Sequence, residues 1–419
     1  MPIKALLFLF PLILCAAVFA QSQQYKAKID WRAIHQSAIV IDTHADTPGR
    51  FVDENFDLGT NTPIGQGHFD LGKVREGNLG AEFFSIWVDP RITTGYTKRA
   101  LDMIDSVYEQ ARLHPDQMVM AYSAEDIIKA RRGPHKRLAA LMGVEGGHAI
   151  ENDIRILRDF YRLGVRYMTL TWANTNEWAD SSGDVDDTAI QHHNGLTDYG
   201  KQIVLEMNRL GMMVDISHVS DKTFEDAIAI SRAPVIASHS SARALTDVPR
   251  NMTDEMLRTV AKNGGVVQVN FNCGFIARDP EYNNKVKAFQ EAHPELVKQQ
   301  DELQKQLEQD HSPETKAKLD QVEKQLKAGN PRPPLSDLID HIDHVAKIAG
   351  IDHVGIGSDF DGVPCTPQGI DSVADLPKIT EALVARGYNE QQIHKILGGN
   401  LLRVFRQVEE VSRELSTTR

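Results

Sequence analysis

Eight short runs of apolar, often β-branched residues recur along the chain, and amphipathic stretches that fit helices separate them. Strands that alternate with helices are typical of β-α-β units and of a parallel sheet. Eight such units predict an α/β fold of the TIM-like (β/α)8 barrel type, which needs about 250 residues. We expect the strands over residues 38–42, 81–88, 140–144, 166–171, 212–216, 234–237, 265–270 and 353–357.

Residues 282–334 break this alternation, because they are rich in Lys, Gln and Glu and contain few aromatic residues. We interpret them as a charged helical hairpin inserted between the seventh and eighth strands, with its turn at His311–Glu314. A solvated spacer, a partner-binding element and a cover for the pocket all fit such a segment. The expected apolar seam of the hairpin is Leu303, Leu307, Leu319, Val322 and Leu326.

Residues 1–20 have the pattern of a secretory signal peptide, with one lysine, a long apolar run and a small-residue end at Ala20. We expect cleavage there, which leaves residues 21–419 as one barrel that is exported, periplasmic or secreted; an uncleaved anchor is the alternative. No second long apolar stretch occurs, so we expect no stable membrane span. In an exported protein Cys273 and Cys365 can form a disulfide or remain two buried thiols.

The excess of acidic over basic residues argues against a nucleic-acid partner. The 46 Lys and Arg residues are outnumbered by 58 Asp and Glu residues, which gives a formal net charge of −12, and no long basic run appears. A nucleic-acid surface needs clustered basic residues.

Polar side chains of metal-binding types follow five of the expected strands, at the point where each strand ends. In a (β/α)8 barrel these carboxyl ends open onto one face, where catalytic groups gather. We therefore expect residues more than 300 positions apart to meet in one pocket. They are His44 and Asp46 after the first strand, Glu145 after the third, His218 after the fifth, His239 after the sixth and Asp359 after the eighth.

These residue types suit a centre that holds two divalent cations. His44 and Asp46 lie two residues apart, so they share one side of an extended strand end, and imidazole with carboxylate suits Zn²⁺. A buried carboxylate such as Glu145 is costly unless it is paired or bound to a cation, and its two oxygens can bridge two ions. Two ions can clamp a water and turn it into hydroxide, with Asp359 placed to accept the proton.

The ordered motifs resemble the membrane dipeptidase (renal dipeptidase) family of zinc peptidases. They are Ile-Asp-Thr-His-Ala-Asp at 41–46, Gly-Val-Glu-Gly-Gly at 143–147, Asp-Ile-Ser-His at 215–218, Ser-His-Ser-Ser-Ala at 238–242 and Gly-Ser-Asp-Phe-Asp-Gly at 357–362. The resemblance implies a barrel with two zinc ions that hydrolyses dipeptides, often with a D-residue at the C-terminal position.

The resemblance also assigns individual roles by motif. It implies that His44 and Asp46 hold one zinc and that His218 and His239 hold the other. Glu145 would bridge both, and Asp359 would handle protons.

Arg250 matches the family arginine that binds the substrate carboxylate, a natural partner for a bidentate guanidinium. We place Asn251 and Trp172 with Arg250 in the substrate site.

The chain departs from the family pattern at Trp172, where many members carry a histidine that contacts the oxyanion. Trp donates one N–H and cannot carry a proton, and loss of one oxyanion donor costs roughly 10²–10³ in rate. Asn174, Asn176 and the pair His192 and His193 are candidate replacements. The insert at 282–334 is a second departure, one that could change which substrates fit.

Three functions fit these observations. The first is an exported zinc dipeptidase with small peptides as substrates. The second is a related barrel metallohydrolase that cleaves another amide or a lactone. The third, motivated by Trp172, is a metal-bound binding protein without turnover. Family members often pair as homodimers, but no feature of this sequence specifies an interface.

Overall fold

The computed structural model describes residues 30–417, except 64, 92–94, 133–134 and 311. The predicted signal peptide, residues 1–20, and His311 of the predicted turn lie outside the described residues. Eight parallel strands follow one another around the molecule in the order β1-β2-β4-β5-β6-β7-β8-β9. Their bounds are β1 Val40–Ala45, β2 Leu79–Trp87, β4 Leu138–Glu145, β5 Val165–Thr169, β6 Met213–Asp215, β7 Ile236–Ala237, β8 Val266–Val269 and β9 Val354–Ile356.

The sheet closes between its first and last strands. A parallel bridge joins Ala45 to Phe360, just beyond β9, and the Asp46 N–H donates to the Phe360 carbonyl at 2.8 Å. The predicted α/β barrel is therefore confirmed, and each of the eight expected strands overlaps a strand of the structure. The sequence analysis missed β3 (Met118–Met120), which pairs only with the first three residues of β4.

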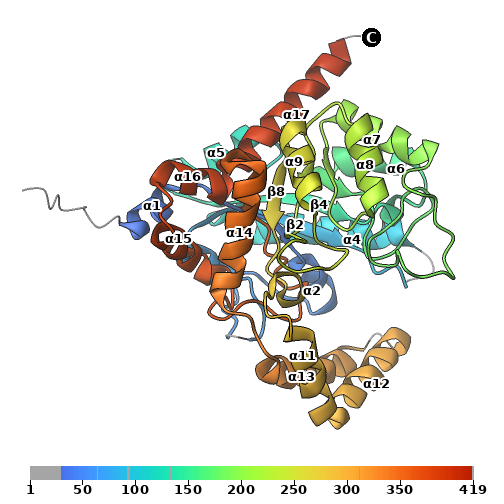
Figure 1. Ribbon diagram of the computed structural model, residues 1–419, viewed down its shortest axis with the longest axis vertical. Coiled ribbons are helices and arrows are strands. Elements are labelled where there is room, and N and C mark those ends of the chain that lie inside the picture. The colour runs from blue at the N-terminus through green and yellow to red at the C-terminus, as the bar shows by residue number, and fades with distance from the viewer. Residues whose placement is uncertain (1–29, 64, 92–94, 133–134, 311, 418–419) are drawn as a thin grey trace, which may run out of the picture.

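Helices follow the strands and cover the outside of the barrel (Figure 1). Several begin at a hydroxyl cap, such as Thr197 on Gly200 N–H and Ser220 on Thr223 N–H, which satisfies an unpaired amide of the first turn. The helices outside the insert are α1 Trp31–Ser37, α2 Thr47–Asp53, α3 Leu71–Glu76, α4 Tyr96–Leu113, α5 Ala124–Arg131, α6 Ile154–Arg162, α7 Asp198–Leu210, α8 Asp221–Ile230, α9 Asp254–Asn263, α10 Cys273–Ile276, α14 Leu335–Ala349, α15 Leu376–Ala385, α16 Glu390–His394 and α17 Asn400–Thr417.

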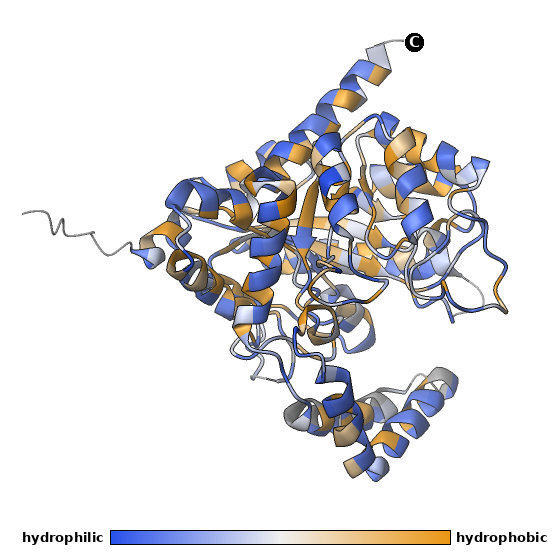
Figure 2. Cartoon of the chain, viewed as in Figure 1, coloured by the Kyte–Doolittle hydropathy of each residue, from blue (hydrophilic) through white to orange (hydrophobic). Residues whose placement is uncertain are grey.

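Figure 2 shows hydrophobic residues along the central strands, while hydrophilic residues cover much of the outer helices. One buried group lies between strands and outer helices, and a second includes Phe83, Leu141 and Tyr167 with Phe405 of α17. The rings of Phe83 and Phe405 lie 6.3 Å apart. Among the described residues no helix is both long and apolar enough to cross a bilayer.

The segment between α10 and α14 carries three helices, α11 (Tyr282–Ala292), α12 (Pro294–Asp310) and α13 (Pro313–Gly329), and it projects away from the barrel (Figure 1). The structure thus adds α11 to the two-helix hairpin that the sequence predicts. Of the expected seam, Leu303, Leu319, Val322 and Leu326 are buried and Leu307 is partly buried. Phe289 of α11 packs against this group, so the insert has a small core of its own.

A disulfide ties the chain on either side of the insert. Cys273 at the start of α10 bonds to Cys365 after β9, with their Cα atoms 5.4 Å apart. The Cys273 N–H also donates to the Cys365 carbonyl. The pairing of these two cysteines, which the sequence left open, is present in the structure.

Candidate metal centre

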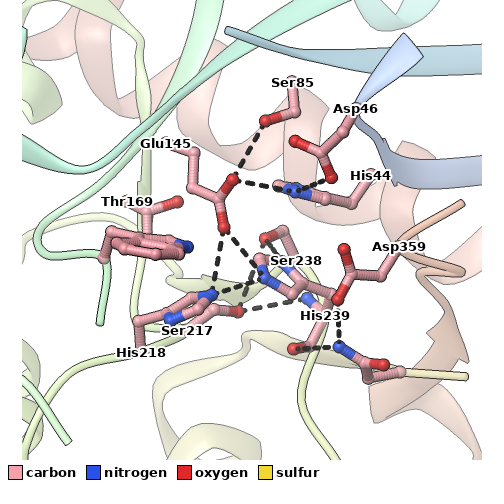
Figure 3. Close-up of polar contacts among 12 residues, drawn as sticks. His44, Asp46, Ser85, Glu145, Thr169, Ser217, His218, Ser238, His239 and Asp359 are labelled. Carbon is pink, nitrogen blue, oxygen red and sulfur yellow. Dashed lines mark hydrogen bonds and ion pairs between the residues drawn. The ribbon is translucent and has the colours of Figure 1, made fainter. Parts of the chain in front are cut away.

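Glu145, the last residue of β4, lies at the centre of the polar side chains that the strand ends bring together (Figure 3). Its Oε2 is 3.3 Å from His44 Nε2. Its Oε1 is 3.0 Å from His218 Nε2 and 3.3 Å from His239 Nε2. The two carboxylate oxygens therefore face different imidazoles, which is the arrangement that bridging requires.

Glu145 is only 3% exposed. Burial alone raises the pKa of a carboxyl, but the imidazoles of His44, His218 and His239 outweigh burial and lower the pKa of Glu145 well below its usual value. Ser85 of β2 donates to Oε2 at 3.1 Å. The side chain is thus an anion at neutral pH, held among atoms that can share it with a cation.

On the Oε2 side, His44 Nε2 lies 3.5 Å from Asp46 Oδ2. Donor atoms of His44, Asp46 and Asp359 all lie within 4.8 Å of one another. Gly362 makes this approach feasible, because a Cβ there would lie 2.0 Å from Asp46 Oδ2 and 2.7 Å from Asp359 Oδ1.

On the Oε1 side, the Nε2 atoms of His218 and His239 are 2.9 Å apart. His218 has a left-handed backbone, with φ of 66°, which costs energy in a residue other than glycine. Its carbonyl accepts the Ser182 N–H at 2.7 Å. This loop contact helps to hold His218 in the conformation that turns its ring toward Glu145.

The donor set fits divalent cations of the zinc type. His44 Nε2 is buried and has no hydrogen-bond partner, and two facing imidazole nitrogens repel unless a proton or a cation lies between them. Burial opposes charge on His44, yet Tyr167, Glu145 and Asp46 raise its pKa well above the usual value. The site therefore favours positive charge, and imidazole with carboxylate oxygen is a ligand combination that zinc accepts.

Asp359 lies just beyond β9 with a left-handed backbone, φ 64°. Asn270, which is fully buried, donates its amide to Asp359 Oδ2 at 2.9 Å. Burial, together with the charges of Asp46 and Glu145, raises the pKa of Asp359 to about 6, although His44 opposes this. A carboxylate with such a pKa can accept and return a proton near neutral pH.

Arg250 borders the same cluster. Its guanidinium donates to Ser240 Oγ at 2.6 Å and to the His239 carbonyl at 2.7 Å, and neither acceptor is charged. Nε is buried without an acceptor, and burial lowers the pKa of Arg250 to about 10. Arg250 is partly buried, and a guanidinium that donates only to neutral acceptors has the charge and the geometry to bind a carboxylate.

The other two residues predicted for the substrate site, Asn251 and Trp172, differ from each other in their surroundings. The amide of Asn251 donates to the carbonyls of Thr246 and Phe275 at 2.9 and 2.8 Å, so this amide group is engaged with the backbone. The ring of Trp172 lies 5.1 Å from that of Trp87 and 6.3 Å from that of His218. Trp172 therefore forms part of an aromatic wall beside the Oε1 side of the centre.

Two of the suggested replacements for the family histidine are occupied elsewhere. Asn176 donates to the Leu170 carbonyl and accepts two N–H groups, while His193 Nε2 contacts the Asn176 carbonyl at 2.9 Å. Trp87, which pairs with Glu145 across β2 and β4, has a buried indole Nε1 without a partner. Sequence reasoning did not select Trp87, although its place at the end of the second strand was a usable signal.

Sequence reasoning also missed Ser85, Asn270 and Tyr167. Ser85 and Asn270 are polar residues on the same strand faces as Glu145 and near a strand end, so a stricter count of alternation could have found them. Tyr167 occupies an ordinary core position within β5, and the sequence gives no sign that its hydroxyl reaches His44.

The sequence of this chain is similar to that of known dipeptidases. The membrane dipeptidase family (peptidase family M19) matches residues 29–419. An uncharacterised dipeptidase of Schizosaccharomyces pombe is 33% identical over 407 residues, which is 92% of this chain and 84% of that protein.

Two solved structures share the fold. The probable dipeptidase PvdM from Pseudomonas aeruginosa superposes with a TM-score of 0.75 at 26% identity, over 91% of this chain and 98% of that one. A metallopeptidase from Rhodobacter sphaeroides, liganded with a phosphinate mimic of the dipeptide L-Ala-D-Ala, has a TM-score of 0.68 at 25% identity, over 88% of this chain and 99% of that one. The match over nearly the whole described chain, together with the ligand-type cluster around Glu145, shows that this chain belongs to the membrane dipeptidase family of metal-dependent peptidases.

Proposed function

We propose that this chain is an exported dipeptidase that holds two Zn²⁺ ions, one on each oxygen of Glu145, and cleaves the peptide bond of dipeptides. The observation that carries the proposal is the division of ligands around Glu145. His44 and Asp46 lie on the side of Oε2, and His218 and His239 lie on the side of Oε1.

The chain's own residues supply positioning and proton transfer. Zn²⁺ at such a centre supplies Lewis acidity, which makes water a nucleophile at neutral pH. Asp359 accepts the proton that the water loses and returns it to the leaving amine, because Asn270 fixes its Oδ2 and its carboxylate lies within 4.8 Å of the donor atoms of His44 and Asp46.

Arg250 holds the carboxylate at the C-terminal end of the dipeptide. Such a contact favours substrates whose carboxylate lies one residue beyond the scissile bond. The wall formed by Trp87 and Trp172 excludes water from the other side of the centre.

Acceptance of a D-residue at the C-terminal position belongs to the same proposal. It is supported by the likeness to the Rhodobacter sphaeroides structure with its L-Ala-D-Ala mimic. L-Ala-D-Ala and L-Ala-L-Ala, compared on purified protein, test it through the ratio of their kcat/KM values.

Metal analysis and one substitution test the central part. We expect about two zinc per chain, and Glu145→Gln should lose both zinc and dipeptide hydrolysis. The matched control is Glu255→Gln on the exposed surface of α9, which should keep both. Full activity in Glu145→Gln, or in protein freed of metal, would contradict the proposal.

A substrate panel separates a dipeptidase from a hydrolase of other amides or lactones. Arg250→Ala should raise the KM for dipeptides, whereas Arg258→Ala, an exposed arginine of α9, should not. Hydrolysis of lactones or acylated amino acids that exceeds dipeptide hydrolysis would reject the dipeptide assignment. Failure to turn over any substrate would favour the binding-protein alternative that Trp172 suggests.

Export is supported by the signal-like residues 1–20 and by the disulfide of Cys273, since disulfides persist in oxidising compartments. Mass spectrometry of the protein from a cell-envelope fraction should find a mature N-terminus directly after Ala20. A chain that retains residues 1–20 would contradict cleavage. We further propose a homodimer, and sedimentation of the purified protein tests this by its mass.

A further inference from the structure

Two of the buried imidazoles are held from behind by hydroxyl groups inside the barrel. His44 Nδ1 lies 2.8 Å from the hydroxyl of Tyr167. The same hydroxyl lies 3.1 Å from the Thr43 carbonyl oxygen. Tyr167 is fully buried, and its ring occupies space that Gly143 leaves open, because a Cβ on Gly143 would lie 2.0 Å from that ring.

The position of the hydrogens in this chain of contacts follows from what each group can donate. A tyrosine phenol is protonated at neutral pH, so Tyr167 has a single hydrogen to donate. The Thr43 carbonyl can only accept, and it therefore takes that hydrogen. Both contacts of the phenol are then satisfied only if His44 Nδ1 carries a hydrogen and donates it to the phenol oxygen.

His239 repeats this arrangement with different residues. Its Nδ1 lies 2.7 Å from Ser238 Oγ, and Ser238 donates to Asp215 Oδ2 at 2.6 Å. The carboxylate of Asp215 also accepts N–H groups of Ser217 and Ser238 and the hydroxyl of Thr169. With four donors on it, this buried carboxylate takes the hydroxyl hydrogen of Ser238, which leaves Ser238 Oγ to accept from His239 Nδ1.

We propose that Tyr167 and Ser238–Asp215 are positioning residues that fix His44 and His239 as Nδ1–H tautomers, so that both Nε2 lone pairs face Glu145 for metal binding. This inference deepens the proposed metal centre and rests on it. A metal-bound histidine usually donates its other ring N–H to a partner that fixes the tautomer and the ring orientation.

Each chain of hydrogen bonds behind a histidine, here called a relay, ends on a different group. The relay behind His44 ends on a neutral carbonyl, whereas the relay behind His239 ends on the carboxylate of Asp215. Negative charge behind an imidazole raises its basicity as a ligand. The relay behind His239 should therefore add more to the zinc affinity on its side than the relay behind His44 adds on the other side.

The first test uses the unaltered, zinc-loaded protein. Long-range ¹H–¹⁵N NMR of histidine-labelled protein reports which ring nitrogen carries the hydrogen, and His44→Asn and His239→Asn spectra assign the signals. We expect Nδ1–H for both rings. An Nε2–H tautomer, or a metal-bound Nδ1, at either ring overturns the inference.

The second test measures zinc affinity by competition with a chelator. Tyr167→Phe should weaken one zinc, and Ser238→Ala the other, by about 10- to 100-fold each. Ser238→Thr, which keeps the hydroxyl, should restore the loss. Thr380→Val is the matched control and should leave both zinc affinities unchanged, because its buried hydroxyl contacts Nδ1 of His35, an imidazole outside the cluster around Glu145.

The outcomes distinguish this inference from the proposed function. Two zinc sites that are unchanged in Tyr167→Phe and Ser238→Ala overturn the inference and leave the function intact. An unaltered protein that binds no zinc overturns the proposed function itself. The two substitutions lie on different strands, Tyr167 within β5 and Ser238 directly after β7. Misfolding of one variant therefore leaves the other variant, and the spectrum of the unaltered protein, as tests.

Discussion

Glu82 provides a test of the electrostatics of this barrel, away from the ligands themselves. It lies on β2 opposite Asp42 of β1 in the strand register. Its side chain is 0% exposed, and neither carboxyl oxygen has a hydrogen-bond partner. Burial, and next the charge of Asp42, raise the pKa of Glu82 well above its usual value of 4.5. The folded protein therefore holds Glu82 as a neutral acid.

Glu82→Gln replaces this acid with a neutral group of the same size, so the effect on stability depends on pH. In the unfolded chain Glu82 loses its proton above pH 4.5, while in the folded protein it keeps the proton to higher pH. The free energy of unfolding of the unaltered protein therefore falls as pH rises, by up to about 1.4 kcal/mol per pH unit for one proton. This loss accumulates over every pH unit between 4.5 and the raised pKa of the folded protein.

Urea unfolding of metal-free protein, followed by tryptophan fluorescence at pH 5, 6 and 7, measures the effect. Titration of all other groups is shared, so the stability difference between Glu82→Gln and the unaltered protein isolates Glu82. We expect Glu82→Gln to gain relative stability with each step in pH, while Glu381→Gln, exposed on α15, gains none. A difference that stays constant across the three pH values would refute the reasoning.

Three further substitutions probe the frame of the site. Gly362→Ala adds a Cβ 2.0 Å from Asp46 Oδ2, so zinc content should drop from about two toward one per chain; unchanged content would show that the neighbours move aside. Cys273→Ser opens a disulfide that spans 92 residues and should lower the free energy of unfolding by about 4 kcal/mol in urea titrations. A variant as stable as the unaltered protein would show that the disulfide does not stabilise the fold. Asp361 accepts N–H of His68, and despite burial its hydrogen bonds lower its pKa. Asp361→Asn should therefore cost roughly 1–3 kcal/mol at pH 7, a cost that shrinks as pH falls below 3.8; a cost that does not change with pH would contradict this sign.

Much of the barrel could be predicted from the sequence because its strands are buried on both faces. Such strands appear as continuous apolar runs, and turn residues mark their ends. β3 escaped detection because it is only three residues long and pairs with three residues of β4. Helix α11 was merged into the insert because a charged segment with few apolar residues gives little periodicity to separate its helices.

The side chains around Glu145 were predictable as a group because ligand types follow strand ends, where a barrel gathers them. The residues that hold these side chains from behind could not be predicted from the sequence. The hydroxyl of Tyr167 meets His44 from a position 123 residues away, and this contact exists only once the barrel closes. The place of Asn251 in the substrate site stays a prediction, since its NH2 group is bonded to backbone carbonyls while its Oδ1 is buried without a partner.

A crystal structure of the zinc-loaded protein, with data collected at the zinc absorption edge, tests the account most directly. We predict two anomalous peaks, one between His44, Asp46 and Glu145 Oε2, and the other between His218, His239 and Glu145 Oε1. A single peak, or peaks away from Glu145, would contradict a centre that this carboxylate shares between two ions.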